Sequence, residues 1–333
     1  MRSCLSFRVA LDGLSLLPTI APARHDHDRL PELTVVVAAA DCAGSIEACL
    51  SSLKMSCAGL DHELRVVVPS GDGTAGQISS VAPGARVILA PVGSLVPVLW
   101  AIGISESRGR IIALTIGQCE VESGWARAMI AGIHGGAAGV GGSLRLADAA
   151  GRVDAAVFFL RYSAFLGRGR QDSSDVTQIA GDNAAYSHAA LQLGGWNRSR
   201  GFWETEFHAL VLAAGGALRF VPHAEATFLG GARLSAFGGQ RFTHGRIFSE
   251  WRVAVNDESR WRILLASPVV PAVLIARIVR RVWPHVGYRR RFLSCLPAIG
   301  WFALCWAVGE AAGAFRAGWF PEAVSDRPSA PRE

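Results

Sequence analysis

The sequence almost lacks lysine. Lys54 is the single lysine among 33 lysine and arginine residues, so the formal net charge of +6 comes almost wholly from arginine. Arginine binds phosphate with two parallel hydrogen bonds, and a basic chain suits an anionic partner such as a nucleotide or an acidic membrane surface, although compositional bias of the genome would produce the same skew. The chain also lacks a helix-turn-helix pattern and any basic run interleaved with aromatic residues. We therefore expect no nucleic-acid partner.

The cysteines lack the spacing of a zinc site or of a disulfide framework. There are seven of them, an odd number, and no Cys-x-x-Cys pair occurs. Both features argue against structural zinc and against disulfide staples. We expect reduced, mostly buried thiols of a cytosolic domain.

The first thirty residues lack a secretory signal. Residues 5–20 are mildly apolar, but Arg8 and Asp12 interrupt them and no clear small-residue cleavage site follows. Residues 24–29 alternate His and Asp between arginines, which either a metal site or a solvated linker would explain, and the linker is the simpler interpretation. We expect residues 1–30 to be a flexible extension.

Apolar sequence, by contrast, is plentiful. Half of the 333 residues are apolar, which is enough for a sizeable core. From Leu33 onward, short runs rich in Val, Ile and Leu alternate with segments of helical periodicity. This alternation predicts an α/β domain over residues 31–255 with a mostly parallel central sheet. The expected strands are residues 33–39, 64–68, 86–90 and 111–114, and the expected helices are residues 46–53 and 96–107.

Residues 111–125 are the stretch around which the domain is expected to be organised. An apolar run leads into a short polar turn, and Glu120 and Glu122 precede Gly124 and a second helical pattern. Open α/β sheets bind their ligands at the loops that follow the carboxyl ends of strands. We expect this loop to face whatever the protein binds.

Gly71, Gly73 and Gly76 match the spacing Gly-x-Gly-x-x-Gly of a dinucleotide site, which would make the protein a nicotinamide enzyme. The match is weak. It follows the second strand, Pro83 leaves little room for a helix, and the next strand ends at Ala90 without an acidic residue for the ribose. A tight turn is the better interpretation.

Carboxylates gather again in the second half of the chain. Upstream of them, the expected elements are a strand at residues 143–146, a helix at residues 157–166 and a polar segment at residues 167–174. Glu204, Glu206 and His208 then lie at the start of a further helix. Two carboxylates in a first helical turn either compensate the helix dipole or act in catalysis, and the pattern leaves both interpretations open.

A series of short motifs runs in order along residues 33–252. They are Asp41 with the helix at residues 46–53, Asp72-Gly73-Thr74, Gly103 with Arg108-Gly109, Cys119 with Gly124-Trp125, Gly181-Asp182-Asn183 with Tyr186, Gly201-Phe202-Trp203-Glu204, and Ala214-Gly215-Gly216 before Arg219-Phe220-Val221-Pro222. No single motif is specific, but the order and spacing together resemble glycosyltransferase family 2. The resemblance implies the GT-A fold, a Rossmann-like fold of nucleotide-diphospho-sugar transferases.

The resemblance also implies a reaction, the transfer of a sugar from a nucleotide-sugar donor to an acceptor with inversion at the anomeric carbon. By motif, Glu204 would take the proton of the acceptor hydroxyl and Glu206 would be a supporting carboxylate. Asp182, Asn183 and Trp203 would line the acceptor side. Because many relatives have Asp where Glu204 stands, the base is longer by one methylene group.

On the donor side, the resemblance implies Asp41, Asp72 and Gln118 as binding residues. The second strand lacks the expected terminal Asp, which leaves Asp72 as its substitute. Residues 116–118, Ile-Gly-Gln, stand where an Asp-x-Asp motif would ligate Mg²⁺ or Mn²⁺ between diphosphate oxygens. Ile and Gly cannot ligate a hard cation and a Gln amide is a poor replacement for a carboxylate, which leaves Glu120 as the nearest candidate ligand.

Residues 239–246, Gly-Gln-Arg-Phe-Thr-His-Gly-Arg, form a basic stretch flanked by glycine. It is faintly similar to the Gln-x-x-Arg-Trp box of processive sugar polymerases. If basic side chains neutralise the diphosphate instead of a metal, the candidates are Arg241, His244 and Arg246 on a loop that closes over the phosphates. A surface helix start with solvated arginines is the alternative.

Two apolar segments separated by arginines follow Trp261. Residues 263–276 are fewer than the about twenty that a membrane span needs, whereas residues 292–315 are long enough. Basic loops stay on the cytoplasmic side, where a nucleotide-sugar domain meets its donor. We therefore expect residues 256–320 to anchor the chain at the cytoplasmic face of the cell membrane, with the first segment interfacial and the second inserted. Buried soluble helices are the alternative, and residues 321–333 are expected to be disordered.

The sequence thus predicts a membrane-associated inverting glycosyltransferase that acts on a lipid-linked or cell-surface polysaccharide acceptor. The alternative is a glycosyltransferase-like protein without donor chemistry that serves as a binding or scaffolding subunit in envelope-glycan assembly. The departures on the donor side favour the second hypothesis. The motifs around Asp182 and Glu204 favour the first.

Overall fold

The computed structural model describes residues 30–166, 174–255 and 258–317. Contacts group residues 31–333 into one unit, and residues 1–30 form a separate one. The predicted N-terminal extension, most of the polar segment at residues 167–174 and the predicted disordered tail lie outside the described residues.

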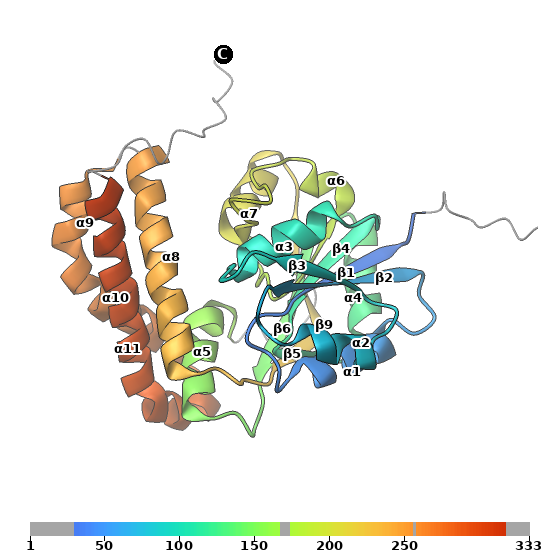
Figure 1. Cartoon of the computed structure of the whole chain (residues 1–333), viewed down its shortest axis with the longest axis horizontal. Helices are drawn as coiled ribbons and strands as arrows, with labels where there is room; N and C mark the ends of the chain where they lie inside the picture. The colour runs from blue at the N-terminus through green and yellow to red at the C-terminus, as the bar shows by residue number, and fades with distance from the viewer. Residues whose placement is uncertain (1–29, 167–173, 256–257, 318–333) are drawn as a thin grey trace, which may run out of the picture. The chain divides into compact units, whose positions relative to one another are not determined.

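A nine-stranded mixed sheet organises the larger unit (Figure 1). Its strand order is β3-β2-β1-β4-β8-β6-β9-β5, with β7 paired to β9. Strands β1 to β4, β6 and β9 run in one direction, and β5, β7 and β8 run against them, so six of the nine are parallel. The predicted α/β class with a mostly parallel sheet is confirmed. The strands are β1 Leu33–Ala38, β2 His62–Pro69, β3 Arg86–Ala90, β4 Ile111–Ile116, β5 Cys119–Val121, β6 Gly139–Leu146, β7 Ser174–Val176, β8 Asn183–Ser187 and β9 Leu218–Phe228.

The two central strands, β1 and β4, are buried at every position, which explains why their sequences are continuous apolar runs without polar alternation. They pair in parallel up to Ala38 beside Ile116, so the segments that follow them meet. The Ser45 hydroxyl donates to the Gly117 carbonyl at 2.8 Å. A Cβ atom on Gly117 would lie 2.5 Å from the sulfur of Cys42, so the close approach of the two segments requires glycine.

Helices flank the sheet and continue into a C-terminal helical region. The two apolar C-terminal helices expected from the sequence are present as α10 and α11. In Figure 1, α8 to α11 stand together in orange and red. The helices are α1 Ile46–Ser56, α2 Ala75–Val81, α3 Val96–Ser105, α4 Trp125–His134, α5 Arg152–Tyr162, α6 His188–Leu191, α7 Glu204–Ala213, α8 Leu234–Val255, α9 Arg260–Ala266, α10 Val270–Val282 and α11 Val286–Ala317, with short 3-10 turns at Ser163–Phe165 and Ser267–Val269.

The basic stretch at residues 239–246 is not a loop, as the sequence suggested, but the interior of the long helix α8. Gly245 in this stretch serves helix packing rather than a turn. A Cβ atom on Gly245 would lie 2.3 Å from the backbone oxygen of Trp306 on α11. The prediction was wrong because local propensity gives glycine no credit for the close contact that it permits between two helices.

Helix α11 contributes glycines to the same contact. A Cβ atom on Gly309 would lie 2.1 Å from the Phe242 backbone oxygen, and one on Gly313 would lie 2.3 Å from the Arg246 backbone oxygen. Small residues spaced four apart lie on one helix face and let two backbones approach closely. This packing fixes α8 along α11, and it thereby determines which face of α8 is turned away from α11.

Two helical stretches, Arg260–Val282 and Val286–Arg316, have the length and apolar composition to cross a membrane. The first is longer than the segment predicted at residues 263–276, because the helix continues through arginines to Val282. Length and composition alone do not distinguish a membrane span from an apolar helix of a soluble protein. The described chain shows no more than this capacity.

Candidate functional site

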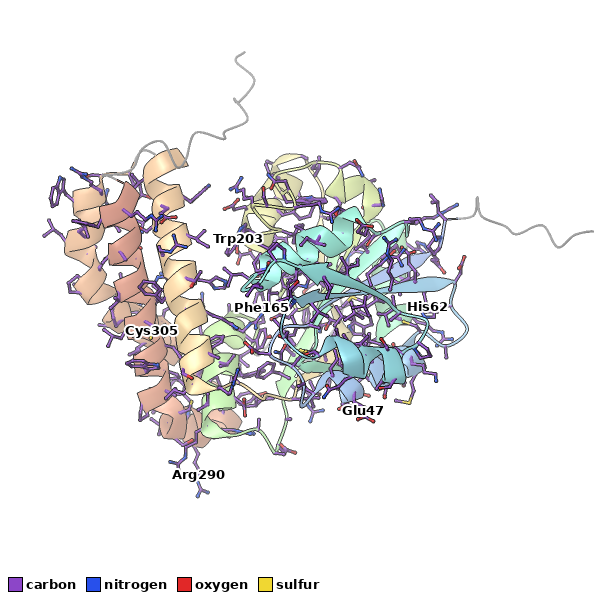
Figure 2. All side chains as sticks on the ribbon, in the orientation of Figure 1. Glu47, His62, Phe165, Trp203, Arg290 and Cys305 are labelled. Atoms are coloured by element: carbon purple, nitrogen blue, oxygen red, sulfur yellow. The ribbon has the colours of Figure 1, made fainter. Side chains whose placement is uncertain are left out.

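A cavity of about 940 Å³ lies at the carboxyl ends of β1 and β2. Its wall is formed by the segments after these strands, the start of α3, the end of α5, the start of α7, one face of α8 and Trp306 of α11. Trp203 and Phe165, labelled in Figure 2, are part of this wall. The volume lies within the range of small-molecule sites, and its position at the carboxyl ends of parallel strands is typical of them.

One face of α8 closes the cavity. The lining residues recur every three or four positions, which places them on a single side of the helix. They are Phe237, Gln240, Arg241, His244, Phe248 and Trp251.

Glu204 is the first residue of α7 and lines the cavity. Burial raises the pKa of Glu204 to about 7, and the nearby charge of Asp182 raises it further than burial alone would. The backbone of α7 and Arg161 act in the opposite direction without cancelling this effect. A Cβ atom on Gly181 would lie 3.3 Å from the Glu204 carboxyl carbon and 2.9 Å from Trp100, so glycine there leaves room for the acid. A carboxyl group with a pKa near 7 is able to accept a proton at neutral pH.

Asp182 stands beside Glu204 and is held from two directions. Arg161 lies 2.7 Å from its carboxylate, and the Tyr162 hydroxyl also donates to it. Asp182 is only 3% exposed. Burial acts against the charge of Arg161, yet Asp182 and the other acidic groups around it together raise the Arg161 pKa above its ordinary value. Arg161 is therefore charged in the cavity wall, and Asp182 balances its charge.

Asn183, the neighbour of Asp182, does not line the cavity. Its amide nitrogen donates to the backbone oxygens of Ser143 at 2.8 Å and Ala224 at 2.9 Å. Its amide oxygen accepts from the Trp125 indole at 2.6 Å. The side chain joins β8 to β6, β9 and α4, so the structure gives it a role in the sheet rather than at the predicted acceptor side.

Trp203 and Glu206, two other residues predicted from the same motif, do line the cavity. The Trp203 indole donates to the backbone oxygen of Arg200 at 2.9 Å, and Arg200 also pairs with Glu206. Burial raises the Glu206 pKa, and Arg200 opposes that shift. Glu206 is thus a paired carboxylate at the cavity wall, in contrast to Glu204.

Asp41 and Asp72 also lie together in the cavity wall. The Asp41 backbone, which has a positive φ of 50°, donates its N–H to the Asp72 carboxylate at 2.8 Å. The Asp41 carboxylate contacts Arg233 and Gln240, each at 3.3 Å. These contacts attach the start of α8 to the loop after β1.

The segment predicted to face the ligand, residues 116–125, contributes nothing to the cavity wall. The Gln118 amide turns back and donates to the Ala40 carbonyl at 2.6 Å. Glu120 lies on the short strand β5, where it is exposed and pairs in register with Thr227. Strand β4 turns almost directly into β5, and this turn leaves no room for the expected ligand-binding loop.

A divalent metal of the kind that the family resemblance implies does not fit these residues. Within residues 30–166, 174–255 and 258–317, no group of three His, Cys, Asp or Glu side chains could hold a metal ion. Glu120 lies outside the cavity wall, and Gln118 is engaged with backbone. Hard cations need several oxygen ligands around one point, which this arrangement does not supply.

Arg241 and His244 lie on the cavity face of α8. Arg241 stacks on the Trp306 ring, with the guanidinium carbon 4.2 Å from the ring centroid. His244 packs edge-on against Trp203 at 5.5 Å between ring centroids. Within the part of the chain that the structure describes, neither the buried Nε of Arg241 nor the buried Nε2 of His244 has a hydrogen-bond partner. Arg246, the third predicted residue, pairs with Glu250 at 2.8 Å and does not line the cavity.

Burial determines the charge of these two side chains. It lowers the pKa of Arg241 to about 10, with a further contribution from the charge of Arg161, so Arg241 stays protonated at neutral pH. Burial lowers the pKa of His244 to about 3, again with contributions from Arg241 and Arg161, so His244 is neutral. The cavity face of α8 therefore presents one positive charge, Arg241, and one neutral imidazole, His244.

Several residues of the cavity wall were not foreseen from the sequence. Arg161 and Tyr162 lie in an apolar helical pattern, Trp100 in another, and Trp306 in the apolar tail. No local motif marks them, because each reaches the cavity through the packing of elements far apart in the chain.

No family model and no curated protein matches this chain. Among solved structures it is similar to a crystal structure of GalNAc-T7 with UDP, GalNAc and Mn2+, at 13% identity and a TM-score of 0.46. The match covers 60% of this chain and 44% of the other, so the chain spans less than half of that neighbour's length.

Proposed function

We propose that the protein is an inverting glycosyltransferase of the GT-A type that moves a sugar from a nucleotide-sugar donor to an acceptor hydroxyl. The observation that carries this proposal is Glu204, a carboxylate in the cavity wall that has no ion-pair partner among the described residues and a pKa raised to about 7. A group with this pKa is half deprotonated at neutral pH and can accept a proton there. The family 2 motifs around Asp182 and Glu204 support the same reaction.

In this reaction the acceptor oxygen forms a bond to the anomeric carbon from the face opposite the departing diphosphate. The bond between that carbon and the diphosphate oxygen breaks, and the electron pair leaves with the nucleoside diphosphate. Glu204 takes the proton of the acceptor hydroxyl. Asp182 and Arg161 hold the wall beside it, and Trp203 and Glu206 border the acceptor. Asp41 and Asp72 border the donor.

The acceptor in this proposal is lipid-linked or part of a cell-surface polysaccharide, and the protein acts at the cytoplasmic face of the membrane. Two features of the C-terminal helices support a membrane location. Arg290 extends away from the helices in Figure 2. Large apolar side chains are exposed along α9 to α11: Leu265, Val269, Val273, Val286, Leu304 and Val308. Apolar surface beside arginine is what an anionic bilayer binds.

The second candidate is a glycosyltransferase-like binding or scaffolding subunit without transfer activity. It is favoured by residues 116–118, which lack the carboxylates of the family motif and lie outside the cavity wall. The two candidates share a fold and differ in donor chemistry. Donor binding and turnover therefore separate them.

The test is the release of nucleoside diphosphate by the purified full-length protein in detergent, measured with a panel of nucleotide sugars, each with Mn²⁺ and with a chelator. Glu204→Gln is compared with Glu47→Gln, which changes an exposed carboxylate in the first turn of α1. The proposal requires at least one donor to be turned over, and it requires E204Q but not E47Q to lose that turnover. A folded protein that binds no donor under either condition would leave the scaffolding function as the better account.

A further inference from the structure

Three arginines line the cavity, Arg161, Arg233 and Arg241, together with the carboxylates Asp41, Asp72, Asp182, Glu204 and Glu206. Arg161 is paired with Asp182, whereas Arg241 has no carboxylate partner among the described residues and depresses the pKa of the neighbouring His244. The charge of Arg161 in turn lowers the pKa of Arg241. Two buried cations that repel one another are stabilised by an anion that lies between them.

The hydrogen-bonding state of the same residues gives an independent indication. The Nε of Arg241 and the Nε2 of His244 are buried and have no partner within the described chain. A buried donor without a partner is destabilising, and more so when it is charged. Structures retain such groups where a ligand completes their hydrogen bonds.

The position of Arg241 is set by tertiary packing rather than by a flexible loop. Its guanidinium stacks on Trp306, and the glycine contact between Gly245 and Trp306 fixes α8 against α11 one turn further on. Stacking leaves the edge of a guanidinium available, and that edge forms paired hydrogen bonds with phosphate oxygens. Arg241 is therefore preorganised to receive an oxyanion.

We propose that Arg241 and Arg161, with neutral His244 as a third hydrogen-bonding group, bind the diphosphate of a nucleotide donor and take the place of a divalent metal. This inference rests on the proposed glycosyltransferase function. It accounts for two observations together: the region around Gln118 and Glu120 cannot ligate a metal, and Arg241 lines the cavity without a carboxylate partner among the described residues. As the sugar departs, the negative charge that develops on the diphosphate is stabilised by side chains of fixed position.

The experiment is calorimetric titration of the full-length protein in detergent with inorganic pyrophosphate and with the diphosphates of uridine, guanosine, adenosine and thymidine. Each titration is performed in a chelator and repeated with Mn²⁺. We expect a nucleoside diphosphate to bind in the chelator, with a dissociation constant that Mn²⁺ changes less than about twofold. Loss of charged hydrogen bonds predicts that Arg241→Gln weakens binding about 10- to 100-fold, with Arg241→Lys between the two.

Arg246→Gln is the matched control, because it removes the same charge from the same helix outside the cavity wall. Its affinity should equal that of the unchanged protein. Equal weakening by R246Q and R241Q would reduce the effect to long-range electrostatics and overturn the proposal. Thermal unfolding of each variant identifies any loss of binding that is due to misfolding. If R241Q is misfolded, R241K is the variant that tests the proposal, because it keeps the charge at the site.

The outcomes also separate this inference from the proposed function. Donor binding and turnover that occur only with Mn²⁺ would overturn the arginine site and leave the glycosyltransferase intact. A second outcome is that pyrophosphate binds in the chelator, that R241Q abolishes this binding, and that no nucleotide sugar is turned over. This result would support the arginine site and contradict the glycosyltransferase function. The absence of all diphosphate binding with and without Mn²⁺ would overturn both.

Discussion

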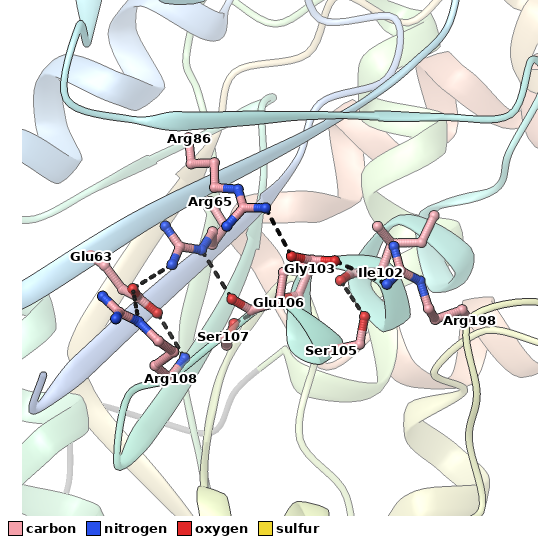
Figure 3. Close-up of polar contacts among 10 residues, drawn as sticks. All are labelled: Glu63, Arg65, Arg86, Ile102, Gly103, Ser105, Glu106, Ser107, Arg108 and Arg198. Carbon is pink, nitrogen blue, oxygen red and sulfur yellow. Dashed lines mark hydrogen bonds and ion pairs between the residues drawn. The ribbon is translucent and has the colours of Figure 1, made fainter. Parts of the chain in front are cut away.

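Charged side chains gather at both ends of the central sheet, and they are arranged in opposite ways. At the amino ends of β1 to β4, Glu63 accepts a hydrogen bond from Thr34 at 2.7 Å. It also accepts one from the Arg108 backbone at 2.8 Å (Figure 3). Glu106 accepts from Arg86 at 3.1 Å and from Arg198 at 2.9 Å, and its backbone oxygen accepts from Arg65. Each of these carboxylates has more than one partner.

At the carboxyl ends, Asp182, Asp41 and Glu206 are each paired with an arginine, but Glu204 and Arg241 have no ion-pair partner within the described part of the chain. Glu204 has a raised pKa, and the Nε of Arg241 lacks a hydrogen-bond partner among the described residues. The same residue types thus form a saturated network at one end and an unsaturated wall at the other. The difference teaches that the number of charges does not mark a functional site, whereas buried groups with unmet hydrogen bonds or a shifted pKa do.

The largest expected effect is the loss of turnover in Glu204→Gln. Removal of a general base typically costs about 10²–10⁴-fold in rate, and the isosteric amide preserves the shape of the site. The measurement is the turnover number with saturating donor. The corresponding change at the other end of the sheet, Glu63→Gln, should leave turnover of the folded protein unchanged. Turnover that survives E204Q would contradict the distinction between the two ends.

The same variant, which should lose activity, should be more stable than the parent protein at high pH. Because the folded-state pKa of Glu204 is raised from 4.5 to about 7, the folded protein holds a proton that the unfolded chain has lost between these pH values, so stability falls as pH rises through this window. Gln cannot titrate. E204Q should therefore match the parent near pH 4.5 and exceed it above pH 7, by at most on the order of 3 kcal/mol. Denaturant unfolding at the two pH values measures the difference, and equal stability at both would argue against a buried, uncompensated carboxylate.

Glu63→Gln tests the saturated end directly. The substitution weakens several charge-assisted hydrogen bonds at once and leaves the Arg65 guanidinium, a part-buried group, poorly compensated. We expect a loss of about 1–3 kcal/mol in the free energy of unfolding. Urea titration gives the number, and E47Q on the exposed side of α1 serves as the comparison. If E63Q leaves the free energy of unfolding unchanged, this network does not hold the strands β1 to β4 together.

The smallest expected effect is the pH dependence of the rate. Glu204 must be deprotonated to accept a proton, and its pKa is raised to about 7. The ratio kcat/KM should therefore fall about tenfold per pH unit below pH 7 and level off above it. A profile that stays flat down to pH 5 would show that the group behaves like the ordinary carboxylates at the amino end of the sheet.

The helices and strands around the cavity show how much of the fold could be predicted from the sequence. The predicted helix at residues 96–107 is α3, and the apolar runs predicted as strands at residues 33–39 and 111–114 are β1 and β4. These elements follow from local patterns, because a run buried on both faces has a recognisable composition. The loop predicted at residues 239–246 is instead part of α8, because Gly245 permits a close contact between helices and does not form a turn.

The site residues divide in the same way. Asp41, Asp72, Asp182, Trp203, Glu204 and Glu206, together with Arg241 and His244, are brought to one cavity. Gln118, Glu120, Asn183 and Arg246 are not part of its wall. Side-chain direction at the end of a strand or along a helix depends on neighbours that sequence spacing does not reveal. The roles of the lining residues remain predictions for the experiments above.

The sequence by itself determined the α/β class, the central strands and the carboxylates at the start of α7, because alternation of apolar runs and helical periods depends on each segment alone. Tertiary structure alone decided that α8 is a continuous helix, that Arg161 and Trp306 reach the cavity, and that residues 116–118 do not. The physical reason is that burial, pKa and hydrogen-bond satisfaction are properties of a whole environment. For Arg241 that environment is assembled from α5, α8 and α11, which lie far apart in the chain.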